Sequence, residues 1–121
     1  MMASVYLSGS TQYDNRGANN YGTEGDRMQY LADRVKDYIA KGQGGITVFR
    51  NQGGMGLQGS INDSNSKHPD IHMALHTNAG GGRGTEAYYW GGSGNTSSVR
   101  LTNLLYARVA PLTAANDRGC K

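Results

Sequence analysis

The chain has a single cysteine, Cys120, which lies next to its last residue. One cysteine cannot form an internal disulfide, so the fold does not depend on an oxidising compartment. No apolar run approaches the ~18 residues of a membrane-spanning helix, which excludes a membrane span. The first residues, MMASVYLSGS, lack the charged and long apolar regions of a signal peptide, so no secretion signal is expected.

Clustered charge is also missing. The 12 basic and 9 acidic residues give a net charge of +3, with a pI of about 9.1. The basic residues do not form a run, which favours scattered, solvated positions over a nucleic-acid-binding patch. We therefore expect no nucleic-acid partner.

Apolar residues are scarce, at 36% of the chain, whereas glycine is abundant, with 19 residues. Much of the chain must therefore form loops and tight turns. A length of 121 residues is enough for one domain with a modest core, and we expect a single domain over 1–121.

Predicted strands and helices alternate along the chain. Apolar residues recur at helical spacing after Thr23, an N-cap candidate with Asp26 three residues on, and predict a helix over 24–41. The tail from Thr113 is polar and looks unfinished. The alternation predicts an α/β domain with a mixed, mostly parallel sheet flanked by helices. Further predicted strands cover 4–7, 46–50, 71–76 and 85–90, and further predicted helices cover 57–66 and 99–109.

The segment HPDIHMALHTNAGGG contains three histidines, His68, His72 and His76, spaced four residues apart. On a helix they would form one stripe, but Pro69 and the glycine run favour a strand. Two residues four apart on a strand are separated by about 13 Å, too far for both to reach one zinc ion. We therefore predict His76, at the strand end, as a metal ligand. For His72 a buried, hydrogen-bonded histidine is the favoured interpretation, and for His68 a loop residue.

Glu24 is predicted to lie at the start of the long helix. An acidic residue there also interacts favourably with the helix dipole, which alone would explain it. Combined with His76, Glu24 becomes a candidate carboxylate ligand, because a catalytic zinc ion takes three protein ligands and leaves a position for water.

The loop AGGGRGTE lacks the Lys-Ser/Thr ending of a phosphate-binding loop. Its glycines allow an extended ligand to approach the backbone closely. Asn78 and Arg83 are predicted to bind an amide or carboxylate of that ligand. Glu86 is either an exposed strand residue or a second acid in the cleft.

These segments resemble the zinc-dependent N-acetylmuramoyl-L-alanine amidases of autolysins, sporulation hydrolases and phage endolysins. The resemblance covers most of the chain, and the histidine segment is its most specific part. It is carried by VYLSGSTQ, YGTEGDRMQYLADRV, ITVFRN, SNSKHPDIHMALHTNAGGGRGTEAYY and LTAANDRGCK. The resemblance implies an amidase-like α/β sandwich, peptidoglycan as the substrate, and a bacterial or phage protein that acts at the cell wall.

The resemblance implies a zinc ion (Zn²⁺) held by Glu24 and His76. The family's first histidine falls at Gly9 to Gln12, where this chain has GSTQ. Either the ion is held differently, with help from His72, or it is bound weakly. The family's catalytic glutamate lies on a later strand, so the sequence is expected to be a truncated domain in which Glu86 is the remaining candidate for general base.

Three hypotheses follow. The chain is a peptidoglycan amidase, or a catalytically impaired relic that binds cell wall, or a structural protein. The last hypothesis rests on the expected loss of the final strand, because an open sheet edge recruits another chain and would produce a homo-oligomer.

Overall fold

The structure is a computed structural model of the 121-residue chain, and it describes residues 3–14, 22–42, 44–77, 85–91, 95–112 and 117–121. Contacts within the chain group into two compact units, Met1–Ala79 and Gly80–Lys121. Each unit is described by itself. The prediction of one domain over 1–121 stays a prediction.

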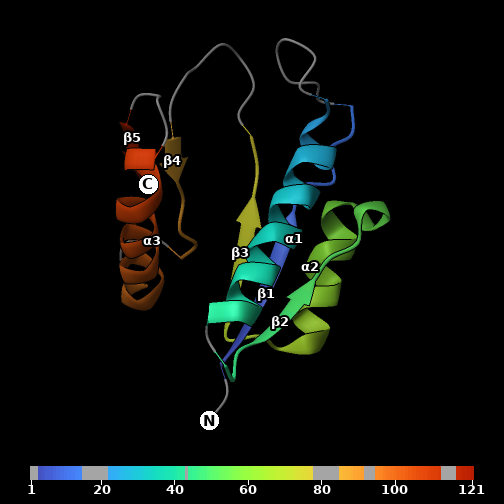
Figure 1. Cartoon of the computed structure of the whole chain (residues 1–121), viewed down its shortest axis with the longest axis horizontal. Coiled ribbons are helices and arrows are strands. Elements are labelled where there is room, and N and C mark those ends of the chain that lie inside the picture. Colours follow the sequence, from blue (N-terminus) through green and yellow to red (C-terminus); the bar gives the residue numbers. More distant parts are fainter. Residues whose placement is uncertain (1–2, 15–21, 43, 78–84, 92–94, 113–116) are drawn as a thin grey trace. The chain divides into compact units, whose positions relative to one another are not determined.

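Unit 1 is built on a parallel three-stranded sheet with the order β2-β1-β3 (Figure 1). Its strands are β1 (Ser4–Gly9), β2 (Thr47–Arg50) and β3 (Ile71–Leu75). Leu7 is aligned with Arg50 on one side and with Met73 on the other. The central strand, β1, has a neighbouring strand along each edge, and both faces of the sheet are covered. Its residues Tyr6 and Leu7 are accordingly fully buried.

The long helix α1 (Glu24–Gly42) begins where the sequence predicts. The Thr23 hydroxyl accepts a hydrogen bond from the Asp26 backbone N–H (3.1 Å) and donates one to the Asp26 carboxylate (2.9 Å). This cap satisfies a backbone donor that a helix start would otherwise leave unpaired. Ala32, the buried apolar residue of α1, completes the small core that Tyr6 and Leu7 begin.

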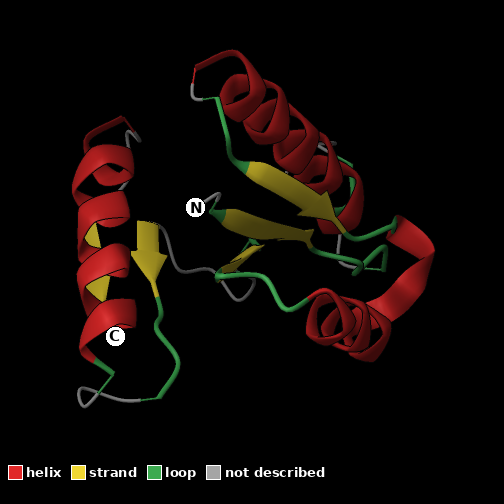
Figure 2. Cartoon of the chain, turned by 90° about the horizontal axis from the view of Figure 1, so that it is seen from below, coloured by secondary structure: helices red, strands yellow, loops and turns green. Residues whose placement is uncertain are grey.

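Helix α2 (Gly56–Lys67) lies on the face of the sheet opposite α1, and Figure 2 shows a helix on each side of these strands. Its buried residues are Ser60 and Ser64 rather than large apolar side chains. Polar contacts therefore fix α2 to the sheet. They include a 2.6 Å hydrogen bond from the Tyr6 hydroxyl to Asp63.

Strand β1 and helix α1 approach closely at Gly9. A Cβ atom at this position would lie 2.8 Å from the backbone oxygen of Met28. Asn51, directly after β2, accepts from the Gly9 N–H (3.0 Å) and donates to its carbonyl (2.8 Å). The same Asn51 amide donates to Ser60 of α2, at 3.0 Å, so one buried side chain joins β1, β2 and α2.

Unit 2 contains the parallel strands β4 (Thr85–Ala87) and β5 (Asp117–Cys120), the helix α3 (Thr96–Val109) and a short 3₁₀ helix, η3 (Ala110–Leu112). The Asn95 side chain caps α3 by accepting from the Ser98 N–H. The backbone N–H of Lys121 donates to Ala87 at 2.8 Å, which extends the pairing of the two strands.

The predicted α/β class is confirmed, and every strand pairing among the described residues is parallel. The strand predicted over 85–90 is shorter in the structure and ends at Ala87. Residues 117–120 of the polar tail, for which no element was predicted, form β5. Its pairing with β4 supplies the order that its own composition does not. In the part of the chain that the structure describes, no helix combines the length and apolar character needed to cross a bilayer.

Candidate functional site

Glu24 and His76 meet beyond the carboxyl end of β3. The Nδ1 atom of His76 lies 3.1 Å from Oε1 of Glu24. The same oxygen accepts a hydrogen bond from the backbone N–H of Thr77, at 3.2 Å. The sequence prediction that these two residues belong to one site is therefore matched by direct contact, whereas their role as metal ligands stays a prediction.

The environments of the two side chains differ. The Glu24 side chain is only 2% exposed, whereas that of His76 is 43% exposed. A buried carboxylate is costly unless hydrogen bonds or positive charge compensate for the lost water. The Thr77 N–H, the His76 ring and the first turn of α1 provide this compensation for Glu24. The result is a fixed acid beside an imidazole that solvent can reach.

His72 is held separately, further back on β3. Its Nδ1 atom lies 2.7 Å from the hydroxyl of Ser64, and its ring stacks on Tyr6 with the centroids 5.2 Å apart. Burial lowers the pKa of the His72 imidazole below its usual value, which favours the neutral ring. His72 is thus hydrogen-bonded, as the favoured sequence interpretation has it. The other half of that interpretation is wrong, because His72 is exposed overall and its ring is only partly covered.

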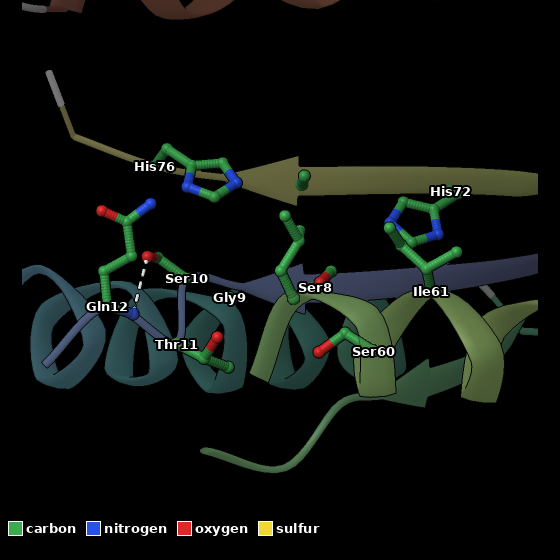
Figure 3. A pocket seen from close by; sticks show the side chains of 11 residues that line it. Ser8, Gly9, Ser10, Thr11, Gln12, Ser60, Ile61, His72 and His76 are labelled. Atoms are coloured by element: carbon green, nitrogen blue, oxygen red, sulfur yellow. Dashed lines mark hydrogen bonds between the residues drawn. The ribbon is translucent and has the colours of Figure 1, made fainter. Parts of the chain in front are cut away.

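His72 and His76 line one pocket of about 60 Å³ (Figure 3). Residues two apart on a strand face the same side, so Ala74 lies on the pocket wall between them. The opposite walls come from Ser8 to Gln12 and from α2. In Figure 3 the Gln12 side chain lies beside His76.

The Glu24–His76 pair fits part of a zinc site. Two ligands about 2.1 Å from a tetrahedral ion lie about 3.4 Å apart, close to the observed 3.1 Å. Among the described residues, however, no group of three His, Cys, Asp or Glu side chains could hold a metal ion. Within this part of the chain the ion would have two protein donors of the usual kinds, and His72 does not complete a third.

The remaining predicted site residues lie elsewhere. Asn78 and Arg83 fall outside the described residues, and their predicted role in substrate binding is untested. Glu86 belongs to unit 2, where its carboxylate lies 2.7 Å from Nζ of Lys121. Its side chain is 6% exposed, so the interpretation of Glu86 as an exposed strand residue is wrong. Its predicted role as general base stays a prediction.

Ser64 and Asn51 hold the walls of the pocket together, but they are not among the site residues predicted from the sequence. Ser60 and Ser64 lie four apart on α2, the spacing that places two helical residues on one face. This small polar stripe is the signal that would have identified the face of α2 toward the sheet. Asn51 carries a weaker signal, its position directly after a predicted strand.

No family model matches the sequence, and no curated protein matches it. Among solved structures, the chain is similar to N-acetylmuramoyl-L-alanine amidase AmiC2 of Nostoc punctiforme, with a TM-score of 0.71. The similarity covers 98% of this chain and 67% of that chain, at 16% sequence identity. At this identity the likeness establishes the fold alone: the chain has an amidase-like α/β fold.

Proposed function

We propose that this chain is a peptidoglycan hydrolase that cleaves the amide bond between N-acetylmuramic acid and L-alanine with a zinc-activated water. The observation that carries the proposal is the 3.1 Å contact between Glu24 and His76 at the end of a parallel strand. The likeness of the fold to AmiC2, which is named as such an amidase, supports the choice of reaction.

Glu24 and His76 would hold the ion. Held there, zinc would supply a water of lowered pKa, about 7, and a positive charge near the substrate carbonyl. The protein contributes a carboxylate whose direction is fixed by the Thr77 N–H. It also contributes an imidazole on the accessible side, where a substrate can approach without displacing Glu24 from its buried position.

Two donors bind an ion more weakly than three. We therefore expect zinc affinity below that of a complete three-ligand catalytic site, with more water in the coordination shell. Zinc titration by isothermal calorimetry and elemental analysis of the dialysed protein measure this affinity. Release of dye from labelled cell walls, with and without added zinc, measures the reaction.

His68 offers a matched control, because it is an exposed histidine in the left-handed conformation at the end of α2 (φ 47°). Asparagine adopts that conformation readily, so His68→Asn keeps the backbone and removes an imidazole. His76→Asn is expected to abolish zinc binding and dye release, and His68→Asn to leave both unchanged. Absence of zinc uptake together with absence of lysis in the unaltered protein rejects the enzymatic proposal. Cell-wall binding that survives a chelator would then favour a non-catalytic relic.

The cell wall as the place of action follows from the same proposal.

Self-association through a sheet edge is a separate proposal, since β2 and β3 are the outer strands of the described three-stranded sheet. Light scattering tests it, and a strict monomer at high concentration rejects it.

A further inference from the structure

The pocket behind His76 has a composition that the proposed zinc site does not explain. It is lined by Ser8, Ser10 and Ser60 and by the apolar residues Leu57, Ile61 and Ala74. The Ser60 hydroxyl is already engaged within the protein, because it donates to a carbonyl of α2 and accepts from Asn51. None of the described residues that line it is a lysine, arginine, aspartate or glutamate. Such walls suit a neutral group that combines hydrogen-bonding atoms with a small apolar part, and they do not compensate a charge.

The volume of the pocket limits the size of the group that it can hold. A water molecule needs about 10–15 Å³ of such space, so a pocket of this size holds roughly four to six water-sized atoms. The pocket has a volume of about 60 Å³. A substituent with four heavy atoms fits in this volume. An acetamido group has four heavy atoms, one carbonyl acceptor, one N–H donor and one methyl group.

His72 supplies a fixed polar group at the end of this pocket away from His76. Ser64, itself 3% exposed, holds Nδ1 at 2.7 Å, and the Tyr6 ring supports one face of the imidazole. Nε2 is then the ring nitrogen that a group in the pocket can reach. A ring held on one nitrogen and one face loses little freedom when a ligand binds to the other nitrogen.

We propose that this pocket binds the acetamido group of an N-acetylated amino sugar, with His72 as the residue that selects it. The inference rests on the proposed function, because N-acetylmuramic acid carries such a group next to the bond to be cleaved. His76 at one end of the pocket and His72 at the other would place the sugar substituent and the reacting amide on the same strand face.

The test is a binding measurement that requires neither zinc nor turnover. The unaltered protein, labelled with ¹⁵N, is titrated with N-acetylglucosamine, glucosamine and N-acetyl-L-alanine in the presence of a chelator. We expect N-acetylglucosamine to shift the amide signals of pocket residues such as Ser8, Ser60 and Ala74. Equal shifts from glucosamine overturn the proposal, and equal shifts from N-acetyl-L-alanine overturn its assignment to a sugar.

Two variants locate the site. His72→Phe keeps a ring against Tyr6 but removes the nitrogen, and we expect about tenfold weaker binding from the loss of one hydrogen bond. Ala74→Val fills the pocket, and we expect it to abolish the shifts even where His72→Phe folds poorly. His68→Asn serves as the control with unchanged binding. Unchanged affinity in Ala74→Val overturns the proposal. If the unaltered protein does not hydrolyse cell wall, the proposed reaction fails, but the binding measurement still decides whether the pocket takes an acetamido group.

Discussion

The Glu24 carboxylate contacts the imidazole of His76 across 52 residues of sequence, with 3.1 Å between Oε1 and Nδ1. Helix α1 contributes the acid from its first residue, and the chain leaving β3 contributes the base. Because both elements pack on β1, the separation of the two side chains is set by the sheet and not by a loop. Any chemistry at this pair therefore depends on the start of α1 and the end of β3 keeping their positions relative to each other.

Glu24→Gln separates the charge of this residue from its shape. Glutamine retains an oxygen that can accept from the Thr77 N–H, so we expect the fold and the melting temperature to change little. Even the loss of a residue that only hydrogen-bonds to a metal ligand weakens metal binding by about tenfold or more. Loss of the negative charge of Glu24 should therefore weaken zinc binding by at least this factor. Calorimetric zinc titration measures the change. Zinc affinity equal to that of the unaltered protein would remove Glu24 from the ligand set.

The helix cap gives a second test of the same site. Thr23→Ala removes the hydroxyl that caps α1, and such a loss costs about 1 kcal/mol. We expect this decrease in the free energy of unfolding, measured in urea, together with weaker zinc binding because Glu24 follows directly. Thr23→Ser retains the hydroxyl and is expected to restore both. A Thr23→Ala protein as stable as the original would show that the hydrogen bonds to Asp26 contribute nothing.

Much of the order of elements was predictable from the sequence, for identifiable reasons. The start of α1 is encoded locally by Thr23 and Asp26, and the strand assignment of 71–76 follows from Pro69 and the alternation after it. β5 was not predictable, because Asp117 to Cys120 has neither alternation nor β-branched residues. Its order comes from pairing with β4, an interaction between residues some 30 apart along the chain.

The candidate site was predictable in part. The contact between Glu24 and His76 follows from their positions at a helix start and a strand end. The partner of His72 was not predictable, since it depends on the rotation of α2 that brings Ser64 to face β3. That rotation is fixed by Asn51 and Tyr6, whose polar contacts have no pattern in the sequence.

The close approach of β1 to α1 predicts a specific sensitivity at Gly9. Gly9→Ala places a methyl group 2.8 Å from the Met28 carbonyl oxygen, and backbone on both sides cannot yield as a flexible side chain would. We expect a loss of about 1–3 kcal/mol in the free energy of unfolding, the usual cost of overpacking. Gly42→Ala, where a Cβ meets nothing within 4 Å, is the matched control and should be neutral or slightly stabilising. Equal effects of the two substitutions would contradict the packing of β1 on α1.

The environment of His72 predicts how stability changes with pH. Burial lowers the pKa of His72 in the folded protein from its usual 6.5, so the unfolded chain binds a proton at a pH where the folded one does not. The free energy of unfolding should therefore be unaffected by His72 above pH 7 and should fall as the pH decreases through and below 6.5. Asp63 acts in a separate window, because hydrogen bonds from Lys67 and Tyr6 hold the pKa of its carboxyl below the usual 3.8.

Urea unfolding between pH 5 and pH 7 isolates the contribution of His72 from that of Asp63. His72→Phe keeps an aromatic ring over Tyr6 and cannot take up a proton, so its stability should depend less on pH across this interval than that of the original protein. His68→Asn removes an exposed histidine and should leave the dependence unchanged. If His72→Phe retains the full loss of stability at pH 5, protonation of His72 is not its cause, and the ring is not held in the partly buried position between Tyr6 and Ser64.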